Sequence, residues 1–256
     1  MRAYRTGHDE AERAVIASGP CSQQLLQKVA ELAPTSRSVL ICGETGTGKT
    51  VLAQVLHAQS ARPYLPLRLL NCAALSDALL ADLMGELDDE AAQQPADDGR
   101  STVLLDEIGE LSPWGQAVLL RKLQHDALHA KVRFIAATHR DLDAMIAAGS
   151  FSRELSWRLN MARLALLPLR ARRDEIVPLA LHFLRLGLRS ASLPFISLDP
   201  PLLDCLESYD WPGNVRELKN AMIGALAVND SGMLGLLDLP DALRSRVAQQ
   251  ALREPS

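Results

Sequence analysis

The sequence predicts an α/β fold in which a parallel sheet is covered by helices on both faces, followed by a small domain built of helices alone. Short, nearly continuous apolar runs alternate with helical patterns as far as about residue 167, which is typical of a buried parallel sheet. Beyond that point the strand signal disappears. The 256 residues are 48% hydrophobic, so the chain can bury a core, and neither a disordered nor a collagen-like protein fits.

In the first part of the chain, helical and strand patterns follow one another. A helix is predicted over 22–32, where leucine and valine recur at helical spacing and Pro34 ends the run. The apolar run SVLIC over 38–42 predicts a strand, and a helix over 51–58 follows a glycine-rich turn. The remaining elements of this part are strands over 64–71, 102–105 and 132–137 and a helix over 114–126.

The second part of the chain shows helical patterns only. They run over 175–188, 200–208, 215–227 and near 241–248. The charged segment LRARRD over 169–174 separates the two parts, which places a domain boundary near residue 170. The predicted organisation is a polar leader over 1–19, an α/β core over 20–170, a helical domain over 171–240 and a tail over 241–256.

Composition and cysteine spacing argue against several classes of protein. The net charge of −4 argues against a protein that coats nucleic acid by bulk electrostatics. The four cysteines form no Cys-x-x-Cys pair and have no histidine at metal spacing, so we expect buried, reduced thiols in a cytoplasmic protein. The amino terminus does not read as a signal peptide. No stretch approaches the roughly 20 apolar residues of a membrane span.

Residues 43–50 read GETGTGKT and fit the pattern G-x-x-x-x-G-K-[ST] at every defined position. The glycines allow a loop tight enough for successive backbone N–H groups to point at phosphate oxygens, and the following helix adds its positive end. Lys49 would reach the β- and γ-phosphates, and Thr50 would offer a hydroxyl to Mg²⁺. An ordinary turn is the alternative, but a strand before and a helix after favour phosphate binding. The residues predicted to bind ATP here are Gly43, Glu44, Thr45, Gly46, Thr47, Gly48, Lys49 and Thr50.

A strand that ends in two carboxylates supplies the second half of this site. The run VLLDE over 103–107 places Asp106 and Glu107 at the carboxyl edge of a parallel strand, where open α/β sheets bind ligands. Asp106 would hold the hydrated Mg²⁺, and Glu107 would orient and polarise the attacking water. An acid pair at a helix N-terminus is the alternative reading. The acid pair lies one helix–strand unit after the phosphate loop, and this position favours the catalytic interpretation.

Seven blocks, in order, resemble the central AAA+ ATPase domain of bacterial enhancer-binding proteins, the activators of sigma-54 RNA polymerase. The resemblance runs from about residue 17 to residue 240. Its blocks are GETGTGKT at 43–50, NCAAL at 71–75, LLDEIGEL at 104–111, LLRKLQ at 119–124, AATHRDL at 136–142, FSRELSWRLN at 151–160 and WPGNVREL at 211–218. It implies a P-loop AAA+ core with a small C-terminal helical lid, and an ATPase that acts in transcription regulation.

The resemblance implies roles for three further residues. Asn71 would be a switch residue that holds Glu107 until a neighbouring subunit or target is sensed; an asparagine making turn hydrogen bonds at a strand end is the alternative. Thr138, with His139, would end a strand as a sensor facing the γ-phosphate, unless this is a surface turn. Arg216 would lie across the phosphates and couple nucleotide state to domain angle, unless it is an ordinary surface arginine.

The resemblance also implies that Arg158 reaches into the next subunit's site as an arginine finger, which makes catalysis depend on oligomerisation. A closed ring follows from such a heterologous interface, and the family usually forms hexamers. A second family arginine directly follows the phenylalanine that corresponds to Phe151. Here that position is Ser152, and Arg153 comes one place later.

The sequence departs from the family where members carry a loop with the signature GAFTGA, whose aromatic tip contacts sigma-54. Residues 84–100 read MGELDDEAAQQPADDGR and contain no aromatic residue. The stretch 82–98 has seven acidic residues and no basic one, so we expect an acidic, flexible, solvated loop without an apolar tip for sigma-54. The residues outside the resemblance are too few for a regulatory or a helix-turn-helix domain, so no direct DNA binding is expected.

Two hypotheses follow from these observations. In the first, the chain is an ATPase that works as a ring in the regulation of transcription, with sigma-54 RNA polymerase as a partner. In the second, it is a binding module that uses ATP to form a hetero-oligomer with an intact AAA+ activator and contacts neither sigma-54 nor DNA itself. ATP turnover and a pull-down with activators discriminate between them. A helicase loader or chaperone-like AAA+ protein shares the phosphate loop but does not explain WPGNVREL.

Overall fold

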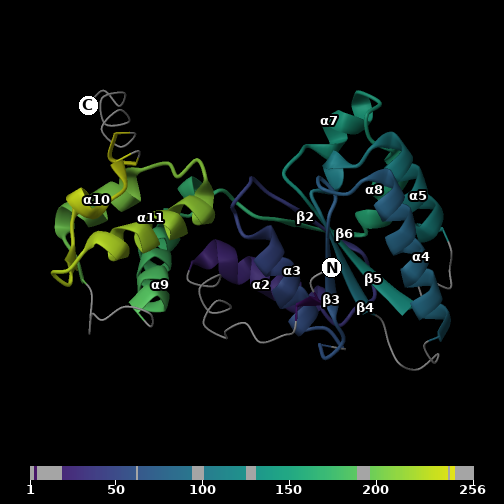
Figure 1. The fold of residues 1–256 in the computed structure, drawn as a ribbon, viewed down its shortest axis with the longest axis horizontal. Coiled ribbons are helices and arrows are strands. Elements are labelled where there is room, and N and C mark those ends of the chain that lie inside the picture. Colours follow the sequence, from purple (N-terminus) through teal and green to yellow (C-terminus); the bar gives the residue numbers. More distant parts are fainter. Residues whose placement is uncertain are drawn as a thin grey trace. The chain divides into compact units, whose positions relative to one another are not determined.

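The computed structural model describes residues 3–4, 19–61, 63–93, 101–124, 131–188, 197–241 and 243–245 (Figure 1). By their contacts these residues form two compact units. The first unit contains the described residues of Met1–Asp9, Gln24–Glu44 and Lys49–Leu166. The second contains those of Glu10–Gln23, Thr45–Gly48 and Leu167–Ser256, so the middle of the phosphate loop is grouped with the chain's second half.

The first unit is built on a six-stranded sheet with the strand order β1-β3-β4-β5-β2-β6. Its strands are β1 (Ala3–Tyr4), β2 (Val39–Cys42), β3 (Leu67–Asn71), β4 (Ser101–Asp106), β5 (Val132–Thr138) and β6 (Ala162–Ala165). All neighbours pair in parallel except β1, which runs antiparallel to β3. The carboxyl ends of β2, β4 and β5 therefore lie at one edge, and the predicted α/β fold with a parallel sheet is confirmed.

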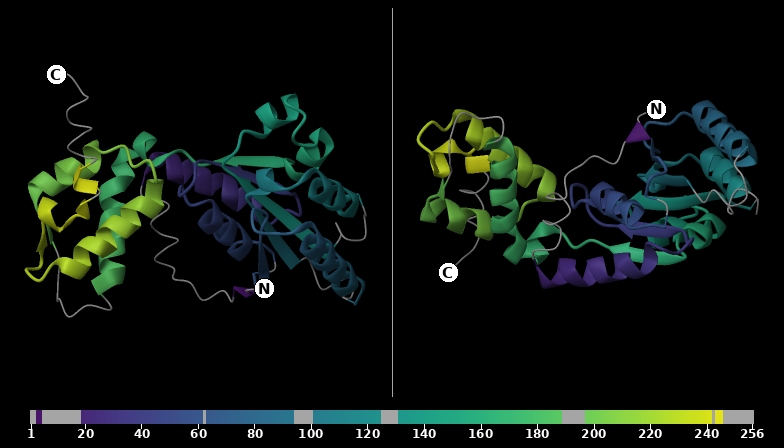
Figure 2. Two further views of the ribbon diagram at one scale, coloured as in Figure 1. Left: turned by 45° about the horizontal axis from the view of Figure 1, so that its top comes forward. Right: turned by 90° about the horizontal axis from the view of Figure 1, so that it is seen from below.

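Helices cover both faces of this sheet (Figures 1 and 2). They are α2 (Pro20–Leu32), α3 (Lys49–Ala58), α4 (Asp77–Gln93), α5 (Pro113–Leu123), α7 (Leu142–Ala147) and α8 (Arg153–Leu159), with a short 3-10 helix η1 (Ile108–Glu110) after β4. On one face, α4, α5 and α8 pack on the strands through a core that includes Leu40, Met84, Phe134 and Leu155. On the other face lie α2 and α3.

Two buried polar contacts fasten the helices of that second face. His57 of α3 lies 2.9 Å from the hydroxyl of Thr102 in β4. The buried Arg133 of β5 donates to the carbonyl oxygens of Ala33 at 2.8 Å and of Leu32 at 2.9 Å. Leu32 ends α2 and Ala33 follows it, so the guanidinium adds hydrogen bonds at this helix end and a positive charge that matches the helix dipole.

The acidic segment predicted as a solvated loop over 82–98 is helical as far as it is described, so that prediction is wrong. Helix α4 continues to Gln93, and residues 94–100 lie outside the described part of the chain. Leu80, Met84 and Leu87 recur at helical spacing and are buried against the first unit's core. Acidic residues between them face solvent, so a helix buries the apolar side chains without burying charge.

Strands β1 and β6 were not predicted. Ala3–Tyr4 falls in the expected polar leader, and two residues are too few to show a pattern. In Ala162–Ala165 only one residue is buried, because an edge strand is half exposed and lacks a continuous apolar run.

In its described residues the second unit has helices packed around a core of its own (Figure 2). They are α9 (Ile176–Leu188), α10 (Pro200–Ser208) and α11 (Asn214–Val228), with 3-10 helices η2 (Leu169–Ala171), η3 (Arg173–Glu175) and η4 (Leu236–Asp238). The predicted helical character is confirmed, with one addition: strands β7 (Ser197–Leu198) and β8 (Met233–Leu234) form a short parallel pair. Of the helix predicted near 241–248, residues 241 and 243–245 are described and are helical, and the others lie outside the described residues.

Trp211 is buried in the core of the second unit. Its ring packs edge-on against Tyr209, and its Nε1 donates to the carbonyl oxygen of Leu206 at 2.8 Å.

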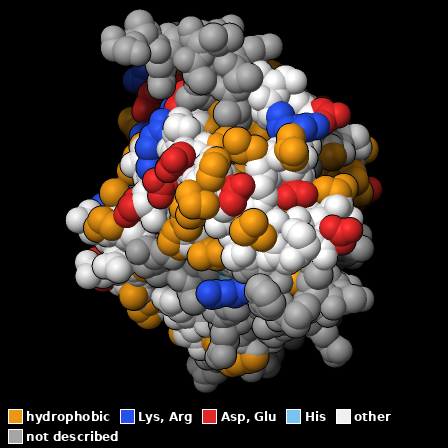
Figure 3. Space-filling view, turned by 90° about the vertical axis from the view of Figure 1, so that its left-hand side faces the viewer, with side chains coloured by type: hydrophobic (Ala, Val, Ile, Leu, Met, Phe, Trp, Pro, Cys, Tyr) orange, Lys and Arg blue, Asp and Glu red, His pale blue; other side chains and the backbone are white. Residues whose placement is uncertain are grey.

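Large apolar side chains also lie on the surface of this unit, where Figure 3 shows apolar groups gathered among acidic and basic ones. The exposed ones are Leu167, Ile223, Val228, Met233, Leu236 and Leu237.

The cysteines are free, as predicted, but they do not share one environment. Cys72 and Cys205 are buried and Cys42 is half-buried. Cys21 is exposed, so the expectation of burial is wrong for that thiol: it lies in the first turn of α2 on the solvent side. Within the described residues, no group of three or more potential metal ligands occurs. No helix in the described part has the length and apolar character to cross a membrane.

Candidate nucleotide site

The phosphate loop connects the end of β2 to the start of α3, as the motif requires. Gly46 and Gly48 have φ angles of +82° and +107°, in the left-handed region that favours glycine. A Cβ at Gly46 would lie 2.3 Å from the carbonyl oxygen of Gly213, so this position is closed to any side chain. Because α3 begins at Lys49, the positive end of a helix adjoins the loop.

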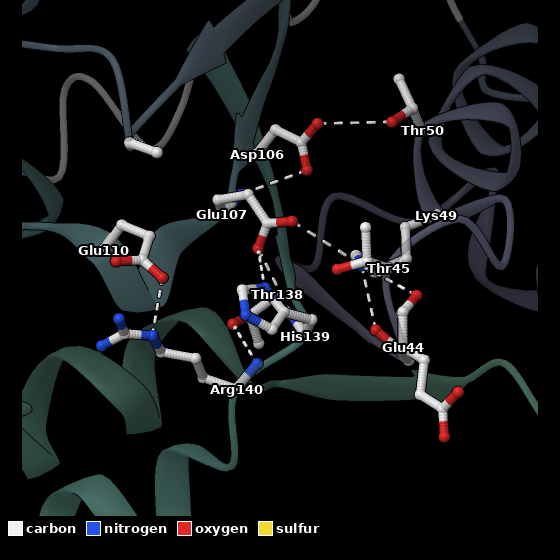
Figure 4. Close-up of polar contacts among 12 residues, drawn as sticks. Glu44, Thr45, Lys49, Thr50, Asp106, Glu107, Glu110, Thr138, His139 and Arg140 are labelled. Carbon is white, nitrogen blue, oxygen red and sulfur yellow. Dashed lines mark hydrogen bonds and ion pairs between the residues drawn. The ribbon is translucent and has the colours of Figure 1, made fainter. Parts of the chain in front are cut away.

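Lys49 is 6% exposed and lies under the loop (Figure 4). Its Nζ donates to the carbonyl oxygens of Gly43 at 2.9 Å and Glu44 at 3.3 Å. The same nitrogen lies 3.9 Å from Oε1 of Glu107. A buried ammonium group must be compensated, and here backbone dipoles and a carboxylate do so.

Thr50 and Asp106 meet between α3 and β4. The threonine Oγ1 donates to Oδ2 of Asp106 at 3.3 Å. Burial and the neighbouring charge of Glu107 raise the pKa of Asp106, against the opposite effect of Lys49. Hydroxyl and carboxylate oxygens are the ligands that Mg²⁺ prefers, and a carboxylate crowded by another acid gains from a cation. The two side chains therefore fit Mg²⁺.

The backbone of Glu107 adopts the left-handed conformation, with φ 55° and ψ 48°. Such a backbone costs on the order of 1–3 kcal/mol for a residue other than glycine, and such costs cluster at functional sites. The turn directs the carboxylate to His139, whose Nδ1 lies 2.7 Å from Oε2 (Figure 4). Lys49 and His139 thus contact the two oxygens of one carboxylate.

Thr138 ends β5 beside the phosphate loop. Its carbonyl oxygen accepts a hydrogen bond from the backbone nitrogen of Gly43 at 3.2 Å. Its Oγ1 accepts from the backbone nitrogen of Arg140 at 3.0 Å. The side chain is fully buried, so the surface turn that was its alternative reading is excluded.

Asn71 ends β3, in register with Asp106 of the neighbouring β4. Its Oδ1 accepts a hydrogen bond from the backbone nitrogen of Ala73 at 3.1 Å, which is the turn contact that formed the alternative reading. The carboxylate of Glu107 is engaged by Lys49 and His139 in this structure. The two predicted partners are thus on adjacent strands, with their side chains engaged elsewhere.

Arg158 lies on α8 and contacts its own chain. Its guanidinium donates to the carbonyl oxygen of Leu123 at 3.2 Å and lies 3.8 Å from Glu154 one turn earlier. Ser152, at the position of the second family arginine, is the N-cap of α8: its hydroxyl accepts from the backbone nitrogen of Leu155. Arg153 is exposed and begins the helix.

Arg216 belongs to the first turn of α11 in the second unit. Its backbone nitrogen donates to the carbonyl oxygen of Gly46 at 3.3 Å, and its side chain is exposed. Sequence reasoning named this residue but missed the two polar side chains that also bind the loop, Arg172 and Asn214. The sequence also did not predict that His139 contacts Glu107. The available indication was that His139 follows one strand and that Glu107 follows its neighbour in the sheet.

Comparisons with known proteins find two families that together span most of the chain. Residues 15–165 match the family described as "Sigma-54 interaction domain", and residues 170–255 match "AAA+ ATPase lid domain". The transcriptional regulatory protein ZraR of Salmonella typhimurium is 40% identical over 252 residues, covering 91% of this chain and 57% of that protein. The response regulator protein FleR of Pseudomonas aeruginosa is 40% identical over 247 residues, covering 89% and 52%.

Among solved structures, NtrX from Brucella abortus in complex with ATP has a TM-score of 0.75 and 26% sequence identity. That comparison covers 88% of this chain and 56% of NtrX. NtrX in complex with ADP has a TM-score of 0.73 at 23% identity, covers 92% and 60%, and supports the fold alone. This chain spans little more than half the length of the curated relatives it matches.

Proposed function

The chain belongs to the sigma-54 interaction domain family, and on that premise we propose that it binds ATP with Mg²⁺, hydrolyses it to ADP and phosphate, and acts in the regulation of transcription. The observation that carries this proposal is the meeting of Lys49, Thr50, Asp106 and Glu107 at the carboxyl edge of the sheet. A cation for phosphates, two hard oxygen ligands and a carboxylate for water are what phosphoryl transfer to water requires.

Each of these side chains has a distinct part in the proposed reaction. Lys49 binds phosphate oxygens, and Thr50 and Asp106 hold Mg²⁺, which when bound neutralises part of the phosphate charge. Glu107 orients the attacking water through a hydrogen bond to its carboxylate. Because Glu107 contacts Lys49 and His139, it must exchange at least one of these contacts when water and phosphate enter.

Three residues are proposed to respond to the nucleotide or to a partner. Thr138 is proposed as the sensor of the γ-phosphate, since it is buried at the strand end that binds the loop. Asn71 is proposed as the switch that takes over Glu107 when its turn contact breaks. Arg216 is proposed to bind phosphates with a side chain that is exposed in the chain alone.

A ring of subunits is part of the proposal, with a hexamer as the expected size. Arg158 is held in its own chain by one carbonyl oxygen and a half-exposed ion pair, and such pairs contribute at most about 1 kcal/mol. The side chain is therefore available to a neighbouring subunit's phosphate at small cost. Beside it, Trp157 is 72% exposed, as a residue at a subunit contact would be in a single chain.

The test of the proposed function is Mg²⁺-dependent ATP turnover by the purified chain, compared with a Glu107→Gln variant. Glutamine keeps the size of the side chain but cannot orient water as a carboxylate does. We expect turnover to fall by at least about a hundredfold while nucleotide is still bound. Equal turnover by both proteins would show that the activity does not come from this site.

The second candidate function is the binding module that modulates an intact activator through hetero-oligomerisation. Two observations favour it: α4 occupies part of the segment that in the family carries an apolar tip, and Ser152 serves as a helix cap in place of an arginine. Contact with sigma-54 through this segment and direct DNA binding are not expected under it. A pull-down of intact activators with and without ATP tests the idea, and retention of none would remove its support.

A further inference from the structure

The loop residues Thr45, Gly46 and Thr47 each have their carbonyl oxygen bound by another part of the second unit. Asn214 Nδ2 donates to Thr45 at 3.1 Å, and Arg216 N donates to Gly46 at 3.3 Å. Arg172 donates through one terminal nitrogen to Thr47 at 2.9 Å. Three successive carbonyl groups are therefore fixed in direction.

The direction of these carbonyl groups determines the direction of the loop's amides. A peptide unit is planar and trans, so its C=O and the N–H of the following residue point opposite ways. Binding the carbonyls of residues 45–47 therefore turns the N–H groups of Gly46, Thr47 and Gly48 to the other side. Successive N–H groups on one side of a loop form an anion-binding concavity.

The donor for Thr47 is itself held in place by a buried ion pair. Arg172 is 6% exposed and Glu175 is fully buried, and their side chains meet at 3.0 Å. The other oxygen of Glu175 accepts from the backbone nitrogen of Gly19 at 3.1 Å. A buried guanidinium with one terminal nitrogen on a carboxylate and the other on a carbonyl has little freedom to rotate.

Asn214 carries the second side-chain contact and is equally constrained. It is fully buried, and its Oδ1 accepts from the backbone nitrogen of Leu169 at 2.7 Å. Its φ of 52° is in the left-handed region, which asparagine tolerates better than most residues. The amide therefore joins η2 to the loop, and its orientation is set by both partners.

We propose that Arg172, oriented by Glu175, is a positioning residue of the phosphate loop, and that with Asn214 it preforms the loop for the phosphates of a nucleoside di- or triphosphate. Neither residue touches the phosphates. The inference rests on the proposed function, because it assigns a cause to the affinity of that site. It identifies the donors on the carbonyl side of the loop, whereas the motif GETGTGKT specifies only the loop itself.

The test compares two variants that change the same kind of side chain. Arg172→Met combined with Glu175→Gln removes the donor to Thr47 without leaving an unpaired buried charge, and the glutamine can still accept from Gly19. Arg173→Met is the matched control: the next residue is also an arginine, but it binds Glu207, Tyr209 and Asp210 and no loop atom. Circular dichroism and the melting temperature report folding in each case.

The readout is the dissociation constant of a fluorescent ADP analogue, and its displacement by inorganic pyrophosphate. We expect the double variant to bind both at least about tenfold more weakly, since a hydrogen bond from a charged group is lost. The control should stay within about twofold of the wild type. Equal binding by the double variant and the control would overturn the proposal, whether both are strong or both are weak.

A third variant and a ligand-free measurement cover the remaining outcomes. Arg172→Lys keeps the charge for Glu175, but one ammonium replaces the two-nitrogen fork, so intermediate affinity is expected. If the wild-type chain bound no nucleotide, the proposed function would fail. Hydrogen exchange of the 43–50 peptide would then decide the anchoring: faster exchange in the double variant than in Arg173→Met supports it, and equal exchange overturns it.

Discussion

The carboxylate of Glu107 lies 2.7 Å from Nδ1 of His139, and the backbone of Glu107 is in the left-handed region. β4 and β5 are neighbours in the sheet, so the residues that follow them meet at its carboxyl edge. One oxygen of the proposed catalytic carboxylate therefore contacts His139, and the other lies near Lys49. The orientation of Glu107 depends on both.

Substitution of His139 should lower turnover and leave nucleotide affinity nearly unchanged. In His139→Ala the Glu107 carboxylate loses a hydrogen-bond partner, so we expect kcat to fall roughly three- to tenfold. The dissociation constant for ATP should change less than about twofold, because among the described residues His139 contacts Glu107 and not the phosphate loop. Single-turnover kinetics and equilibrium binding measure the two quantities separately.

The control for this prediction is His139→Asn, since an asparagine amide can still donate to Glu107. Its kcat should lie between those of the wild type and His139→Ala. Weakened ATP binding at an unchanged kcat in the alanine variant would contradict the positioning role.

The helical structure of the acidic segment can be tested by measuring how substitutions in α4 change the free energy of unfolding of the protein. Met84 is fully buried on the inner face of α4, whereas Glu86 is exposed on the same helix. Met84→Ala should lower the free energy of unfolding by about 2–5 kcal/mol, because it leaves a cavity. Glu86→Ala should change it by less than about 0.5 kcal/mol. Urea titration followed by circular dichroism gives both values.

Equal small effects of the two substitutions would mean that Met84 is solvated, as the loop prediction required. A large loss in Met84→Ala alone supports the helix. The comparison is direct because both residues lie within one turn of each other.

The parts of the fold that follow from local pattern could be predicted from the sequence. The helix over Pro200–Ser208 has a helical pattern and two prolines at its start, and it was predicted with these bounds. The phosphate loop was predictable because its chemistry requires glycines at fixed positions. The helical structure of the acidic segment was not predictable in the same way. Its many charges obscured the helical spacing of Leu80, Met84 and Leu87.

The contacts of the site were predictable only in part, since they join residues far apart in the chain. Asp106 beside Thr50 follows from two motifs whose chemistry requires a common metal. The pairing of Glu107 with His139 depends on which strands are neighbours and on a left-handed backbone. Neither the strand order nor this backbone conformation can be predicted from a local sequence pattern. The role of Asn71 stays a prediction, since its side chain makes a turn contact here.

The thiols should differ sharply in reactivity. Burial, with the nearby charges of Asp106 and Glu107, raises the pKa of Cys72 to about 12. A thiol with so high a pKa stays almost entirely protonated near neutral pH, and the thiolate is the reactive form. Cys21 is exposed. At pH 8 a thiol reagent should therefore modify Cys21 rapidly and leave Cys72 unmodified in the folded chain.

Mass spectrometry of the labelled peptides measures this difference. In urea all four cysteines should react, and Cys21→Ser should remove the fast phase in the folded protein. Modification of Cys72 as fast as Cys21 without denaturant would contradict the buried position.

Mixing two inactive variants tests whether Arg158 completes the site of a neighbouring subunit. Arg158→Ala removes the finger from one subunit, and Glu107→Gln disables the other part of the reaction. In a ring, some interfaces of the mixture join an intact Glu107 to an intact Arg158, so turnover should reappear on mixing. Its rate should rise with protein concentration, because the active interface forms by association. The two variants assayed separately are the controls. A mixture no more active than its components would place Arg158 outside the shared site and favour the binding module.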